Sequence, residues 1–108
     1  MRKAEVLYKK EVAGILTQLD DGSFIYKYVD TWFQAINKPS ISLTLPKNKQ
    51  EYRSEFLFPF FYNMLPEGSN KQVVCFEMKI DNDDLFGLLL VTAESDTIGA
   101  IQVRKTES

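Results

Sequence analysis

The first part of the chain alternates between apolar and polar residues with a period of two, which predicts β-strands. The predicted strands cover residues 3–9, 12–19 and 23–28. Two polar turns separate them. One is Lys9-Lys10-Glu11, and the other is Asp20-Asp21-Gly22, in which glycine accepts a positive φ without steric cost. Because these connections are short, we expect the three strands to form an antiparallel meander.

Gly14 lies inside the second predicted strand. A glycine at this place has no side chain to pack, so it indicates a β-bulge or the close approach of another segment. In the third predicted strand, Phe24, Tyr26 and Tyr28 share one face. We expect that face to contribute large rings to the core.

A fourth strand is predicted over residues 40–45, where apolar residues alternate with serine and threonine. Pro39 prevents a helix before it, and Pro46 ends it. The apolar members of this strand are Ile41, Leu43 and Leu45. Before it, Asp30 is expected to cap a short helix over residues 31–36, and residues 47–50 read as a charged loop.

From about Gln50 onward, apolar residues recur every three or four positions, which predicts helices. We expect the first helix to be capped by Ser54, to hold Pro59 in its first turn and to end at Pro66-Glu67-Gly68. Its apolar positions are Phe56, Leu57, Phe60, Phe61 and Met64.

Two further helices and a last strand are predicted. Ser69 is expected to cap the next helix, with Gln72 completing a capping box, and Asp81 to cap the third. The apolar side of the second helix is formed by Val73, Val74, Phe76 and Met78, and the third contains Leu85, Phe86, Leu88 and Leu89. Residues 97–103 are predicted to form a closing strand in which Gly99 permits a close approach.

Together these elements predict an α+β fold. We expect a small antiparallel, partly barrel-like sheet of about five strands, with three to four short helices, in one domain over residues 1–108. A chain of 108 residues can bury enough surface for a core without metals or disulfides.

Composition narrows the cellular setting. The net charge of −2 does not predict direct nucleic-acid binding, and the single cysteine, Cys75, cannot form an internal disulfide. The first residues lack the apolar run of a signal peptide, and no apolar stretch approaches the roughly 20 residues of a membrane span. We therefore expect a cytoplasmic protein that does not bind membranes.

The sequence contains none of the catalytic motifs that we considered. There is no histidine, so histidine acid–base chemistry and histidine metal sites are excluded. The glycines are too dispersed for a phosphate-binding loop, and Cys75 lies among apolar residues as a buried thiol would. Asp81–Asp84 does not begin a calcium loop, because Phe86 and Thr92 stand where glycine and glutamate are needed. We expect no enzyme activity, no metal and no cofactor.

Two surface features leave alternatives open. Lys38, Lys47, Lys49 and Arg53 form either a solvated loop, which is the favoured interpretation, or a contact for phosphate or an acidic partner. The aromatic run over residues 56–62 covers more than one helical face. Core packing explains most of these rings, and some are candidates for a partner surface.

Three segments are more specific than these patterns. They are Pro39–Pro46, Phe60–Gly68 and Asp96–Ile101, supported by residues 12–16 and the Phe24-x-Tyr26 segment. In this order and spacing they resemble the N-terminal subdomain of the HipA family of serine/threonine kinases, over nearly the whole chain. The sequence departs from that family by stopping after the first subdomain, before the parts that bind ATP and catalyse transfer.

A chain of this length resembles HipS, the small subunit of split HipBST toxin–antitoxin systems. The resemblance implies a non-catalytic protein that binds and restrains a HipT-like serine/threonine kinase, with a HipB-like DNA-binding protein as a candidate third component. The partner-binding residues that we expect lie in the turn between two predicted helices; they are Leu65, Pro66, Glu67, Gly68, Ser69, Asn70 and Lys71. An ordinary helix connection explains this segment equally well.

Two departures concern this turn. The fused family usually has arginine three residues after the glycine, where this chain has Lys71, and stand-alone forms often have a bulky apolar residue where this chain has Ser69. Two other hypotheses also remain. The chain is an accessory subunit that completes or activates a split HipA-type kinase, or it is an excised fragment of a full kinase.

Overall fold

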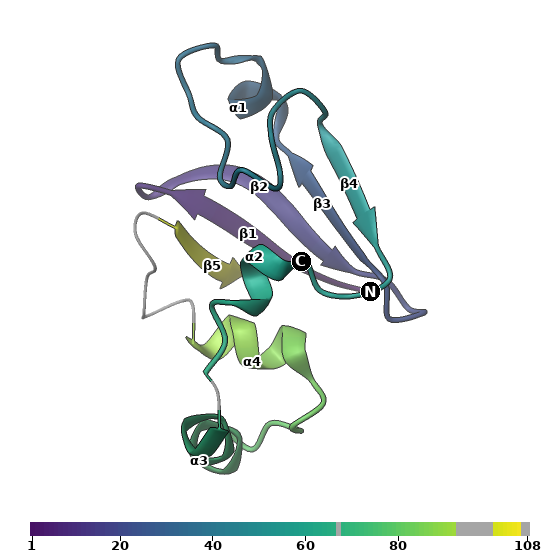
Figure 1. The fold of residues 1–108 in the computed structure, drawn as a ribbon, viewed down its shortest axis with the longest axis vertical. Helices are drawn as coiled ribbons and strands as arrows, with labels where there is room; N and C mark the ends of the chain where they lie inside the picture. The colour runs from purple at the N-terminus through teal and green to yellow at the C-terminus, as the bar shows by residue number, and fades with distance from the viewer. Residues whose placement is uncertain (67, 93–100, 107–108) are drawn as a thin grey trace.

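The computed structural model describes residues 1–66, 68–92 and 101–106, and in this part of the chain a five-stranded antiparallel sheet has the order β4-β3-β2-β1-β5 (Figure 1). The strands are β1 (Arg2–Tyr8), β2 (Glu11–Gln18), β3 (Phe24–Tyr28), β4 (Glu51–Ser54) and β5 (Ile101–Lys105). The helices are α1 (Asp30–Gln34), α2 (Pro59–Tyr62), α3 (Gly68–Met78) and α4 (Leu85–Thr92). The α+β class is confirmed, and the sheet is open rather than closed into a barrel.

The predicted meander of the first three strands is confirmed. Lys9 and Lys10 form the tight turn after β1, with φ angles of 49° and 70°, which are the left-handed values that a two-residue hairpin turn requires. At the next turn Gly22 has φ 90°, and the Leu19 amide donates to the Ser23 carbonyl at 2.8 Å. Each turn therefore returns the chain antiparallel to the preceding strand.

Both expectations for Gly14 are confirmed. Val6 pairs with Gly14 and Leu7 pairs with Val12, so β2 has one additional residue and bulges at this point. The Tyr26 ring from β3 lies over the Gly14 backbone, where any Cβ atom would overlap the hydroxyl and the ring. The missing side chain is therefore what allows a buried tyrosine to cross β2.

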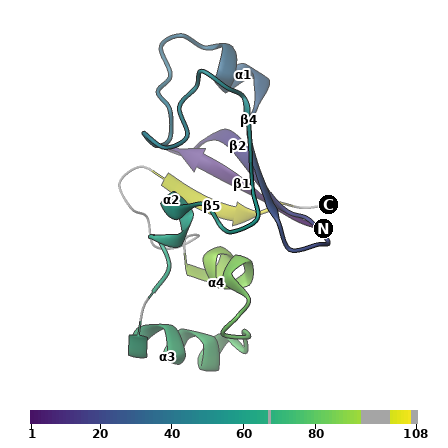
Figure 2. The same cartoon turned by 45° about the vertical axis from the view of Figure 1, so that its right-hand side comes forward.

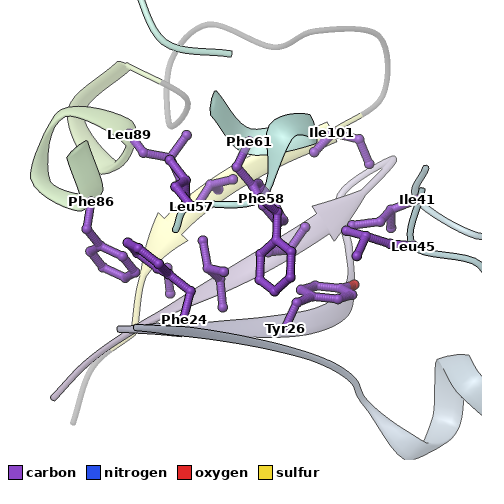
Figure 3. Close-up of a cluster of buried hydrophobic side chains, with 14 of the residues drawn as sticks. Phe24, Tyr26, Ile41, Leu45, Leu57, Phe58, Phe61, Phe86, Leu89 and Ile101 are labelled. Carbon is purple, nitrogen blue, oxygen red and sulfur yellow. The ribbon is translucent and has the colours of Figure 1, made fainter. Parts of the chain in front are cut away.

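The core lies on one face of the sheet. Phe24, Tyr26 and Tyr28 of β3 point into it and are buried, as their spacing predicts. Figure 3 shows the side chains that pack over the rings of Phe24 and Tyr26. They are Leu57 and Phe58, which precede α2, Phe61 of α2, and Phe86 and Leu89 of α4. Helix α3 lies farther out, beyond α4, at one end of the long axis of the molecule (Figures 1 and 2).

The predicted fourth strand at residues 40–45 is wrong. These residues belong to the loop between α1 and β4, and the strand next to β3 is Glu51–Ser54. Side-chain hydrogen bonds replace ladder bonds in this loop: the Tyr28 hydroxyl donates to the Leu45 carbonyl and accepts from the Ile41 amide. The alternation that resembles a strand arises because Ile41 and Leu45 turn into the core.

The first two predicted caps are also wrong. Asp30 is the first residue of α1 rather than its cap, and its carboxylate accepts a hydrogen bond from Gln50 Nε2 at 2.7 Å. Ser54 ends β4, and its hydroxyl accepts from the Phe56 amide at 3.1 Å. The helix expected after it is consequently reduced to α2, where Pro59 occupies the first turn as predicted.

The later helix boundaries also shift. Helix α3 begins at Gly68, one residue before the expected cap Ser69. Asp84 rather than Asp81 caps α4, because its Oδ1 accepts from the Gly87 amide at 3.1 Å while Asp81 bonds the Asp83 amide in a local turn. The predicted last strand corresponds to β5, which continues to Lys105. Residues 97–100 of the expected range, including Gly99, lie outside the described residues.

Candidate functional site

The predicted partner-binding segment joins α2 to α3. Leu65 is 9% exposed and belongs to the core, so it anchors the segment rather than presenting a contact. Pro66 is half-buried, and Gly68 is exposed with φ 57°, a left-handed value that glycine adopts without strain. Glu67 lies outside the described residues. The described part of the segment therefore runs from a buried leucine to the exposed first residue of α3.

The rest of the segment is the first turn of α3. Ser69 and Asn70 are exposed, and Lys71 is half-buried. Pro66, Gly68 and Lys71 line a cavity of about 210 Å³ together with Tyr62, Leu65 and Leu85. The structure thus brings four of the predicted residues to one cavity and leaves Ser69 and Asn70 at the surface.

This cavity combines an apolar wall with two polar side chains, the Lys71 amine and the Tyr62 phenol. No acidic group among the described residues forms an ion pair with Lys71. Its volume matches a single large side chain, and it is too small for a nucleotide. The arrangement suits a protein contact in which one apolar side chain enters beside a cation.

Helix α3 presents an apolar face that the described part of the domain does not cover. Val73 is 52% exposed and Phe76 is 86% exposed, and with Ser69 they fall at i, i+4 and i+7 on one face of the helix. Of the expected apolar side of this helix, only Val74 packs against the core, beside the buried Cys75. The other three members of that apolar side, Val73, Phe76 and Met78, are exposed.

The exposed face is held in a fixed orientation. At the C-terminal end of α3, Lys79 has φ 56°, and the Ile80 amide donates to the Cys75 carbonyl at 2.9 Å. The Lys79 amide also donates to the Phe76 carbonyl, so the helix ends in a Schellman turn. This turn fixes the direction in which the chain leaves α3 toward α4.

Helix α4, against which α3 packs, is fastened to the sheet by an ion pair. The Arg2 guanidinium donates to both carboxylate oxygens of Asp84, at 2.6 and 3.1 Å, and lies 4.9 Å from the centre of the Phe86 ring. The hydrogen bond from Arg2 lowers the pKa of Asp84. Arg2 therefore links the first strand to the start of α4.

The described residues contain no group of three or more cysteine, aspartate or glutamate side chains placed to hold a metal ion. Cys75 is buried, and among the described helices none is long and apolar enough to cross a membrane.

The sequence pattern does not mark Val73 and Phe76 as surface residues. Val73 and Phe76 lie on one face of the helix and Val74 and Cys75 on another, and both faces are apolar. Sequence alone gave no means of deciding which one the domain covers. The aromatic run is split in a similar way, because Phe58 and Phe61 are buried while Phe56 and Tyr62 are exposed.

Comparison with known proteins identifies the family. The HipA N-terminal domain model matches residues 4–104. A solved structure of the N-terminal domain of HipA toxin superposes with a TM-score of 0.73 at 27% identity, covering 100% of this chain and 95% of that one. An uncharacterized protein of Haemophilus influenzae is 30% identical over 105 residues, which is 97% of this chain and 93% of that protein.

A longer relative carries the same region. The Sinorhizobium fredii protein named "Putative kinase Y4mE" is 27% identical over 103 residues, which is 95% of this chain but 24% of that protein. This chain therefore spans about a quarter of that relative. With the family match over residues 4–104 and the shared fold, the chain belongs to the HipA N-terminal domain family.

Proposed function

We propose that this protein is a single-domain, non-catalytic subunit of a toxin–antitoxin system, an antitoxin like HipS that binds and restrains a HipT-like serine/threonine kinase in the cytoplasm. Membership of the HipA N-terminal domain family supports a partnership with a HipA-type kinase. The relative named as a kinase also supports it, because there the same region is part of a much longer chain.

The exposed face of α3 carries the proposal. Phe76 is 86% exposed on a helix whose end is fixed, and Val73 lies one turn before it. Large apolar side chains at the centre of an interface supply most of its binding energy when a partner buries them. The same face continues to Ser69 in the first turn of the helix, and we call the surface of Ser69, Val73 and Phe76 the α3 surface.

The first test is binding of a HipT-like kinase encoded beside this chain. Phe76→Ser and Val73→Ser should each weaken binding about tenfold or more, because each removes an apolar side chain that the kinase would bury. Phe56→Ser is the matched control, since Phe56 is also exposed, at 76%, but lies before α2. Equal affinity of all three variants and the wild type would exclude the α3 surface.

The second test decides the sign of the effect. Co-expression with the kinase should restore growth and lower kinase autophosphorylation if the protein is an antitoxin. A rise in autophosphorylation would instead support the alternative, an accessory subunit that completes or activates a split kinase.

The turn before α3 has its own test. The double variant Glu67→Ala with Asn70→Ala should weaken inhibition more than it weakens folding, because Asn70 is exposed at the start of the helix. If inhibition by the folded double variant were unchanged, the turn would not be the inhibitory segment. A HipB-like DNA-binding protein is the candidate third component. Co-purification of all three chains would test whether it joins the complex.

A further inference from the structure

The loop between α1 and β4 is rigid although it contains no regular secondary structure. Trp32 Nε1 donates to the Pro39 carbonyl at 2.8 Å, and the Lys47 amide donates to Ser40 Oγ at 2.8 Å. Lys47 Nζ donates to two carbonyls inside the loop, of Ala35 and Lys38, at 2.6 and 2.7 Å. With the Tyr28 bonds to Ile41 and Leu45, these contacts fix the backbone on both sides of the loop tip.

The tip of this loop presents an apolar side chain to solvent. Ile41 and Leu45 are buried, whereas Leu43 between them is 98% exposed, and Ile36 at the start of the loop is fully exposed. Single exposed leucines are common on protein surfaces. Leu43 differs because its backbone is already ordered, so burying it in a partner would cost little conformational entropy.

The surroundings of the loop are basic. The β1–β2 turn touches the loop, since Lys38 pairs with Glu11 and the Tyr8 and Trp32 rings lie 5.6 Å apart. The loop and this turn carry Lys9, Lys10, Lys38, Lys47 and Lys49. Neither the loop nor the turn contains an acidic residue, and the flanking ones are Glu11 in β2 and Asp30 in α1. Although the net charge of the chain is −2, the loop and this turn therefore carry an excess of lysines.

The helical region has the opposite charge. From α3 to α4 the described chain has Lys71 and Lys79. Its acidic residues are Glu77, Asp81, Asp83 and Asp84. A partner surface matched to the loop would thus be acidic around an apolar recess, unlike one matched to α3.

We propose that this loop is a second contact for the kinase subunit, separate from the α3 surface, with Leu43 in an apolar recess and the Lys9, Lys10 and Lys49 amines facing carboxylates at its rim. The amines of Lys38 and Lys47 bind inside the domain and take no part in this contact. This inference rests on the proposed function. Its partner is large enough: the region matched in Y4mE is 24% of that protein. The rest of such a kinase would be about three times as long as this chain and, if compact, roughly 50 Å wide. Because the longest dimension of this domain is 42 Å, one partner of that width can reach both contacts.

The test measures the affinity of the purified kinase subunit for wild type, Leu43→Ser, Phe76→Ser and the double variant, with Phe56→Ser as the control. Leu43→Ser should weaken binding about tenfold or more, because the kinase would lose an apolar side chain that it buries. The melting temperature should not change, because Leu43 has no contacts in the core to lose. If the two contacts are independent, the loss in the double variant should equal the product of the single losses.

A charge variant tests the lysines. Raising the salt concentration from about 0.1 M to about 0.5 M should weaken wild-type binding more than that of Lys10→Glu with Lys49→Glu. If Leu43→Ser binds like wild type while Phe76→Ser is impaired, the loop inference is wrong and the proposed function stands. If wild type does not bind the kinase, both are wrong.

Two other occupants would also overturn the inference. Sedimentation of the chain alone would show a dimer that Leu43→Ser abolishes if a second copy covered the loop. Binding of a duplex DNA probe that depended on the lysines but not on Leu43 would assign the basic region to nucleic acid.

Discussion

The sheet side of the molecule and helix α3 use apolar residues in opposite ways. On the sheet side, Tyr26, Tyr28 and Phe61 are fully buried and in ring contact, with Tyr26 and Tyr28 in an edge-to-face arrangement at 4.9 Å. On α3, Phe76 is 86% exposed. The difference shows that the sheet and the segments packed on it supply most of the stability, whereas the exposed face of α3 contributes little to it and is available for a contact.

The largest loss of stability is expected on the sheet side, from Gly14→Ala. A methyl group would overlap the Tyr26 ring and hydroxyl, and the rigid strands on both sides leave little room for relaxation. We expect the free energy of unfolding to fall by about 3 kcal/mol, measured by urea denaturation. Gly22→Ala is the control, because no atom lies near its Cβ and only its φ of 90° opposes alanine. An equal loss in both variants would refute the steric explanation.

Next in size is the contrast between two tyrosines of β3. Tyr28→Phe should lower the free energy of unfolding by about 2 kcal/mol, because the Ile41 amide and the Leu45 carbonyl would lose their buried partner. Tyr26→Phe should be neutral or stabilising, since the buried Tyr26 hydroxyl has no hydrogen-bond partner among the described residues. Comparable losses in the two variants, again by urea denaturation, would contradict this account of the loop.

The ion pair between sheet and helices gives a smaller, pH-dependent effect. Asp84→Asn keeps a side chain that can cap α4 but removes the charge that Arg2 binds, so the loss at pH 7 should be below about 1 kcal/mol. The pKa of Asp84 is lowered in the folded protein, so its contribution is present above about pH 4 and is lost as the pH falls through the folded pKa.

Wild type and Asp84→Asn should therefore differ in denaturation at pH 7 and converge in strong acid. A difference that stayed constant down to pH values well below about 4 would show that the effect is not the loss of this charge. Asp84→Ala, which also removes the cap, should be less stable than Asp84→Asn at every pH.

The smallest effect is expected on α3. Phe76→Ser should change the free energy of unfolding by less than about 0.5 kcal/mol, because its ring is exposed and no core contact is lost. Thermal denaturation beside Phe61→Ser, a buried ring on α2, would measure the contrast. A large loss in Phe76→Ser would mean that α3 contributes to the core, and that its exposed face is not free for a partner.

The sequence predicted the sheet better than the helices. The first three strands, both turns and the meaning of Gly14 are confirmed, because alternation and turn residues act over a few positions. The strand expected at residues 40–45 is wrong for a tertiary reason. The hydroxyls of Tyr28 and Tyr52 bond the loop backbone, so the same alternation produces an ordered loop.

The candidate site was only partly predictable. The turn residues Pro66 and Gly68 give a local signal, and the structure places both at one cavity with Lys71. Val73 and Phe76 give no such signal, because a helix with two apolar faces does not show which face the rest of the chain will cover. The predicted caps failed by a few residues for a related reason, since an aspartate or serine can bond several nearby amides.

The sequence by itself determined the class of the fold, the order of its strands up to β3 and the family to which the chain belongs. The fold class and the strand order follow from periodicity and turn chemistry, which are properties of neighbouring residues. The family follows from the resemblance of three segments in their order along the chain. Only the tertiary structure decided that Leu43 and Phe76 face solvent while Ile41 and Leu45 do not. Exposure depends on which segments pack together, and distant parts of the chain settle that.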